Sequence, residues 1–193
     1  MGKISVSLPA LFVLAAFFVL DQTALPFLFA ASAAAHEGGH LLAMRICGRG
    51  LVRLRMTLTG AEIVYTQGSY RDDFAVALAG PAASLLLALG AAAAGRASGV
   101  PSLYTLSGVS LVLGAFNLLP APPLDGGRAL FAGLCVRSGP ESAVRILRAA
   151  GAGTAGIVGI LGIYGFRCTG SIVPLICAGL FLIFFVVNDL KLV

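Results

Sequence analysis

Residues 30–48 read AASAAAHEGGHLLAMRICG, an apolar stretch with three ionisable side chains inside five positions. His36 and His40 are the two histidines of the whole chain, and Glu37 directly follows the first. Side chains four residues apart on a helix differ by about 40° in azimuth and about 6 Å in height, so both imidazoles would share one face. They could hold one metal ion, with Glu37 beside a water on that metal. This is the H-E-x-x-H arrangement of zinc hydrolases.

Chance gives this pattern in fewer than about one in a hundred chains of this length at average residue frequencies. Ionisable groups inside a membrane span are costly and usually mark function. Gly38 and Gly39 between the histidines each cost a helix roughly 1 kcal/mol relative to alanine. They either leave room for the backbone of a substrate or allow another helix to pack closely.

The overall composition predicts a membrane protein. The chain has 193 residues, of which 59% are hydrophobic and 11% charged, and its mean hydropathy is +0.99. Soluble domains average about 25% charged residues. The net charge of +5 comes without a basic run carrying interleaved aromatics, so we expect no nucleic-acid partner.

Apolar runs predict an all-α, polytopic fold of six spans, since about 20 apolar residues cross a bilayer. With the N-terminus inside the cell, Arg96 and Arg167 fall outside and the other eleven of thirteen Lys and Arg residues fall inside, as the positive-inside rule requires. Both termini are therefore expected in the cytoplasm. We expect one domain over residues 1–193, with approximate spans at 4–20, 24–47, 74–95, 103–119, 145–166 and 171–189.

Residues 50–70, between the second and third spans, are rich in β-branched residues and punctuated by Gly60 and Gly68. They predict a short β-hairpin, roughly 51–58 and 62–66, at the cytoplasmic face. The hairpin either offers a sheet edge that holds an extended substrate or is an ordinary capping loop. Proline at Thr57 or Thr59 would separate the two readings.

A glycine recurs at every third position of the fifth span, and small residues let membrane helices approach closely. This stripe predicts a packing seam and leaves a homodimer open; its members are Gly153, Gly156, Gly159, Gly162 and Gly165. The four cysteines have no C-x-x-C spacing and are read as small packing residues.

Catalytic zinc usually has three protein ligands, so a carboxylate or a cysteine must join the histidines. Asp125 differs from the other carboxylates because it lies in the segment NLLPAPPLDGGR, residues 117–128, directly after its prolines and Leu124. Its prolines cannot continue a helix, and irregular backbone at membrane depth must line a cavity or be buried in protein. Asp125 is the third ligand on this argument, at the same cytoplasmic depth as His40.

HEGGH at 36–40, followed by N-x-x-P-x-x-P-L-D-G-G at 117–127, resembles the site-2 protease family of intramembrane zinc metalloproteases (peptidase M50). The wording NLLPxxPLDGG is most similar to its sporulation branch, stage IV sporulation protein FB. The resemblance implies one Zn²⁺ per chain on His36, His40 and Asp125, with Glu37 as catalytic base. It also implies substrate contacts from the second motif, namely Asn117, Pro120 and Pro123.

A further segment, AGPAAS at 79–84, resembles the G-P-x-x-N element of the family, with Ser84 standing where asparagine is common. The resemblance implies cleavage within or near a transmembrane segment of a membrane protein, in regulated intramembrane proteolysis. Candidate substrates are a sigma-factor precursor or an anti-sigma factor, in a bacterial inner membrane. Neither a CBS nor a PDZ domain is expected, and a regulatory membrane partner is left open.

Two other functions fit the sequence less well. A metal transporter would usually show paired repeats with interrupted helices in corresponding halves, whereas this chain has one cluster and one break. A catalytically inactive relative that binds clients is disfavoured because each expected catalytic group is present.

Overall fold

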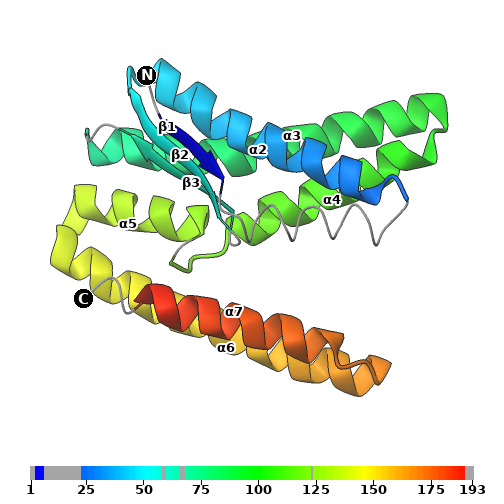
Figure 1. Cartoon of the computed structure of the whole chain (residues 1–193). Coiled ribbons are helices and arrows are strands. Elements are labelled where there is room, and N and C mark those ends of the chain that lie inside the picture. The colour runs from blue at the N-terminus through cyan, green and yellow to red at the C-terminus, as the bar shows by residue number, and fades with distance from the viewer. Residues whose placement is uncertain (1–2, 7–22, 58–59, 66–67, 123, 190–193) are drawn as a thin grey trace. The chain divides into compact units, whose positions relative to one another are not determined.

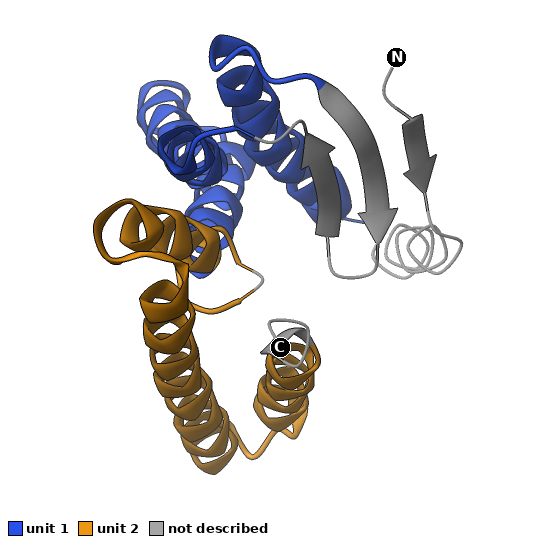
Figure 2. Cartoon of the chain, turned by 90° about the vertical axis from the view of Figure 1, so that its left-hand side faces the viewer, with its two compact units in different colours: residues 1–116 blue, residues 117–193 orange. Residues whose placement is uncertain are grey.

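The computed structural model describes residues 3–6, 23–57, 60–65, 68–122 and 124–189. The chain forms two compact units, Met1–Phe116 and Asn117–Val193 (Figure 2). The described residues contain six helices and three strands (Figure 1), so the predicted mainly helical class is confirmed. The strands form a three-stranded sheet, whereas only a two-stranded hairpin was expected.

Three helices of the first unit correspond to the second, third and fourth expected spans. They are α2 (Leu25–Ile46), α3 (Tyr70–Ser98) and α4 (Pro101–Asn117). The Ser69 hydroxyl accepts a hydrogen bond from the Asp72 N–H at the start of α3, as an N-cap does. Gly99, at φ 72°, ends that helix, because glycine adopts the left-handed conformation at little cost.

The sheet of the first unit has the order β1-β2-β3, with β2 in the centre. Strand β1 (Lys3–Val6) is parallel to β2 (Leu51–Thr57), and β2 is antiparallel to β3 (Gly60–Tyr65). The expected start of the first span at residue 4 is wrong, since residues 3–6 pair with β2. The remainder of that span, residues 7–20, lies outside the described residues.

The second unit contains α5 (Asp125–Ser138), α6 (Pro140–Thr169) and α7 (Val173–Asp189). Helices α6 and α7 correspond to the fifth and sixth expected spans and run side by side (Figure 1). Helix α5 was not among the expected spans. A small core packs the proline-rich segment against α6 and α7 through Ala121, Leu124, Ala155 and Phe181.

Two described helices, α3 and α6, are long and apolar enough to cross a membrane, and Val173–Val187 is a shorter apolar helix. Helix α4 has 17 residues, and α2 carries the polar HEGGH segment. Membrane insertion of these other helices, the six-span topology and the cytoplasmic termini stay predictions.

The glycine stripe of α6 divides into two parts. A Cβ at Gly162 would lie 2.5 Å from the Ala178 Cβ, and one at Gly165 would lie 3.0 Å from the Pro174 Cβ. A Cβ at Gly153 or Gly156 would meet nothing within 4 Å. Within the stripe, close packing on α7 is therefore found at Gly162 and Gly165 and is missing at Gly153 and Gly156.

Gly162→Ala should destabilise the chain, because the new methyl overlaps Ala178. Overpacking of this kind costs about 1–3 kcal/mol. Gly156→Ala, the same change on the same helix, meets no neighbour and should raise stability by up to about 1 kcal/mol, since alanine is the better helix former. Thermal unfolding of both variants in detergent micelles, followed by circular dichroism, measures the difference. Equal midpoints for the two variants would show that the α6–α7 contact is not close.

Candidate metal centre

One face of α2 carries the candidate ligands. The buried residues of this helix recur at intervals of four or more over its length, and they are Pro26, Ser32, His36, His40 and Met44. Side chains four apart lie on the same face of a helix, and this helix packs on α3. Both imidazoles are 4% exposed. They therefore lie at the interface with α3.

The tautomer of His40 follows from its partner. Its Nδ1 lies 2.7 Å from the backbone oxygen of Val76. A carbonyl only accepts, so Nδ1 carries the proton and the Nε2 lone pair is available to a metal. Pro81 lies in the next turn of α3 and lacks the N–H that would bond to the carbonyl four residues earlier. The ladder of α3 is thus interrupted beside the carbonyl that His40 uses.

His36 has a different partner. Its Nδ1 lies 2.9 Å from the Ser84 Oγ, and Ser84 is fully buried on α3. The two imidazole rings are perpendicular, with centroids 5.0 Å apart and an interplanar angle of 82°. Both rings therefore contact α3 through Nδ1, and Nε2 is the nitrogen of each ring that would bind a shared metal.

Two glycines permit this arrangement. A Cβ at Gly80 of α3 would overlap the His40 ring, and a Cβ at Gly39 of α2 would overlap the Ala79 carbonyl. A Cβ at Gly38 would meet nothing within 4 Å. Of the two explanations for the glycine pair, close helix packing holds for Gly39, whereas Gly38 faces open space.

Asp125 begins α5 in the second unit and is 6% exposed. The next two residues pack against the preceding segment: a Cβ at Gly126 would overlap the Leu118 carbonyl, and one at Gly127 would overlap the Ala121 carbonyl. The proline-rich segment therefore folds tightly back on the start of α5. The Arg128 guanidinium lies 3.5 Å from an Asp125 carboxylate oxygen.

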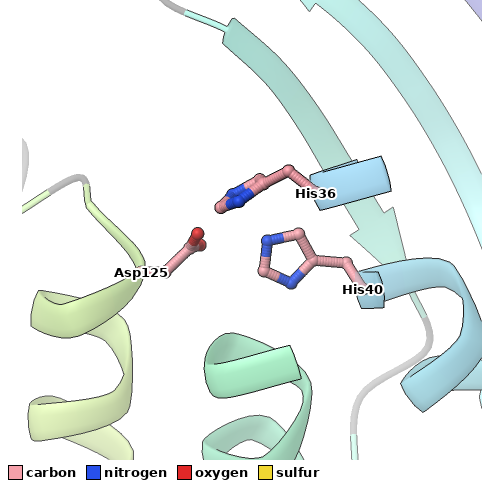
Figure 3. A group of neighbouring side chains, drawn as sticks. All are labelled: His36, His40 and Asp125. Carbon is pink, nitrogen blue, oxygen red and sulfur yellow. The ribbon is translucent and has the colours of Figure 1, made fainter. Parts of the chain in front are cut away.

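The side chains of His36, His40 and Asp125 point toward one another (Figure 3), and one ligand atom from each lies within 4.8 Å of the others. Two imidazole nitrogens and a carboxylate oxygen are donors that zinc prefers. Zinc bonds of about 2.0–2.2 Å need ligand atoms roughly 3.5 Å apart, so small side-chain movements would suffice. The donor set fits the expected metal.

The other predicted site residues are placed as follows. Glu37 is half-buried on α2, and Asn117 is half-buried at the last residue of α4. Pro120 is exposed in the segment before α5, and Pro123 lies outside the described residues. Their roles stay predictions.

Sequence reasoning missed the contacts of the imidazoles with α3, namely the hydrogen bonds to Val76 and Ser84 and the close approach to Gly80. Two of these residues lie in the AGPAAS segment, which the family resemblance had singled out. Ser84 has a clear polar contact there, since it bonds to His36. A backbone carbonyl such as that of Val76 leaves no signal in the residue type.

Comparison with known proteins shows the family of the chain. Residues 10–120, more than half of the chain, match the family Peptidase M50B-like, and residues 93–158 match Peptidase family M50. The chain belongs to peptidase family M50. Site-2 proteases of this family are membrane proteins, in keeping with the apolar helices α3 and α6.

A zinc metalloprotease of Methanocaldococcus jannaschii is 30% identical over 116 residues, which make up 58% of this chain and 34% of that relative. The chain thus spans about a third of the length of that curated relative. The solved site-2 protease from M. jannaschii is 25% identical with a TM-score of 0.69, covering 94% of this chain and 86% of that one. The sporulation branch stays a prediction from the NLLPxxPLDGG wording.

Gly39→Ala should push α2 away from α3 and separate the imidazoles from Val76 and Ser84. We expect a loss of stability of about 1–3 kcal/mol together with a reduced zinc content. Gly38→Ala adds the same methyl one residue away, in open space, and should keep the zinc content and lose no stability. Zinc per chain, measured by atomic emission on purified protein, tests this. Full zinc content in Gly39→Ala would contradict the packing account.

Proposed function

We propose that this chain is an intramembrane zinc metalloprotease that hydrolyses a peptide bond within or near a transmembrane segment of a membrane protein. The observation that carries the proposal is the buried group of His36, His40 and Asp125. Family membership supports the same reaction class.

His36 and His40 would hold the metal through Nε2, since the Nδ1 of each is bonded elsewhere, and Asp125 would supply the carboxylate. The chemistry that zinc supplies in such a site is ionisation of water near pH 7 and polarisation of a carbonyl oxygen. Burial of the three ligands keeps competing water away from them and strengthens the attraction between carboxylate and cation.

Glu37 would move the proton. It follows His36 on α2, so a water at the metal would lie within its reach. The carboxylate would take a proton from the water whose oxygen attacks the carbonyl carbon, and would deliver it to the nitrogen of the leaving amine as the C–N bond breaks. Asn117 would support the oxyanion through its amide N–H groups, and Pro120 and Pro123 would shape the substrate path beside it.

A substrate helix must be extended before attack, because its peptide groups are occupied by helical hydrogen bonds. A sheet edge could replace those bonds by strand addition. Strand β2 is paired on both sides, whereas β1 and β3 each have one partner among the described residues. Of these two edge strands, β3 belongs to the hairpin that was expected to hold the substrate. We therefore assign the substrate edge to β3, and proline at Thr57 would disrupt the sheet itself. Thr59 lies outside the described residues.

Finer aspects of the function follow from the resemblance. The proposed setting is regulated intramembrane proteolysis in a bacterial inner membrane. A sigma-factor precursor or an anti-sigma factor is the proposed substrate class, and sporulation is the process that the NLLPxxPLDGG wording favours. A homodimer or a regulatory membrane partner would control the reaction.

Glu37→Gln tests the proposal, because it removes the proton carrier and keeps the metal ligands. We expect cleavage to fall by about 10²–10⁴-fold with zinc content unchanged. His40→Ala should lose both. Terminal peptides of membrane proteins from cells expressing each form, compared by mass spectrometry, give the cleavage, and atomic emission gives the zinc.

New termini inside transmembrane segments should appear with the wild-type chain alone. Equal cleavage by Glu37→Gln would rule out the assigned base. Zinc flux into proteoliposomes without any new termini would favour the transporter instead.

A further inference from the structure

The hydroxyl of Ser84 is the partner of His36, and it comes from a different helix. We propose that Ser84 is a positioning residue for the metal: its Oγ accepts the Nδ1 proton of His36 and thereby turns Nε2 toward the ion. The inference rests on the proposed role of His36 as a ligand. It gives a role to Ser84, which stands where the family commonly has asparagine.

The surroundings of Ser84 restrict where its hydroxyl can point. The residue is 0% exposed, and its Oγ lies 2.9 Å from the His36 Nδ1. On its other side, a Cβ at Gly114 of α4 would lie 3.0 Å from the Ser84 Cβ and 3.3 Å from the Pro81 carbonyl oxygen. Helix α4 therefore packs closely behind Ser84, while the hydroxyl faces α2.

The hydrogen-bond partner of His40 fixes its tautomer, whereas the partner of His36 does not. Val76 offers His40 a carbonyl, which accepts only, so His40 is held with its proton on Nδ1. Ser84 offers His36 a hydroxyl, which can accept from Nδ1–H or donate to a bare Nδ1. Only the first arrangement leaves Nε2 open to a metal. The Ser84 hydroxyl can therefore pair with either tautomer of His36. Metal binding at Nε2 selects the tautomer in which Ser84 accepts the Nδ1 proton.

Without the Ser84 oxygen, the Nδ1–H of metal-bound His36 would be buried without its acceptor, and the ring would lose its orientation. Partners of this kind typically change metal affinity by about 10–100-fold. A hydroxyl is a weaker acceptor than a carboxylate, so we expect the lower end of that range.

Ser84→Ala removes this oxygen and little else. Ser110→Ala is the matched control: Ser110 is also 0% exposed, and its Oγ has no hydrogen-bond partner among the described residues. Zinc affinity of the full chain in detergent micelles is measured by competition with a chromogenic chelator. We expect about tenfold weaker binding for Ser84→Ala and wild-type binding for Ser110→Ala, with equal helical content by circular dichroism.

Equal affinity for Ser84→Ala and wild type would overturn the proposal, as would equal losses in both serine variants, which would indicate a packing effect. If Ser84→Ala does not fold, the zinc-loaded wild type provides the test by NMR. A slowly exchanging, hydrogen-bonded Nδ1 proton on His36 supports the proposal, and a rapidly exchanging one overturns it. Wild-type protein that binds no zinc would instead refute the proposed function.

Discussion

The close approach of α2 to α3 is the constraint on which the candidate site depends. It is possible because Gly39 meets the Ala79 backbone and Gly80 lies beneath the His40 ring. At this separation the Val76 carbonyl and the Ser84 hydroxyl both reach an imidazole Nδ1. A wider gap would leave the imidazoles at the right spacing along α2 but without groups to orient them. Metal binding thus requires the helix pair as well as the two histidines.

The Asp125 carboxylate is positioned by a different part of the chain. The prolines before Asp125 end regular structure after α4, and Gly126 and Gly127 let the segment fold back against the start of α5. Leu124 and Ala121 anchor that segment in the core formed with α6 and α7. A buried carboxylate is costly without a charged or hydrogen-bonding partner. Arg128 nearby provides such compensation, and a metal ion bound at the site would add to it.

Much of the site could be predicted because its signals are local. The i, i+4 spacing of His36 and His40 on one helix and the break before Asp125 are properties of short segments. The partners of the imidazoles are different, since they depend on which turn of α3 faces which turn of α2. Ser84 lies 48 positions from His36, and no local pattern gives that register.

The same reason explains the differences in the fold. Strand β1 is four residues long at the start of an apolar run, and its pairing with β2 joins positions that differ by 50, as Lys3 and Arg53 do. Apolar content alone therefore suggested the beginning of a span. Helix α5 follows a proline-rich segment and has two glycines in its first turn, which masked its start. The helices with long apolar runs, α3 and α6, were predicted well because composition alone identifies them.

The central claim is that one zinc ion is held by two imidazoles and a carboxylate. Zinc K-edge X-ray absorption on the zinc-loaded full chain tests it most directly, because the spectrum distinguishes imidazole nitrogen, oxygen and sulfur neighbours. The account predicts two imidazoles with the remaining neighbours oxygen, at about 2.0–2.2 Å. A sulfur neighbour near 2.3 Å, contributed by one of the four cysteines, or fewer than two imidazoles would contradict it.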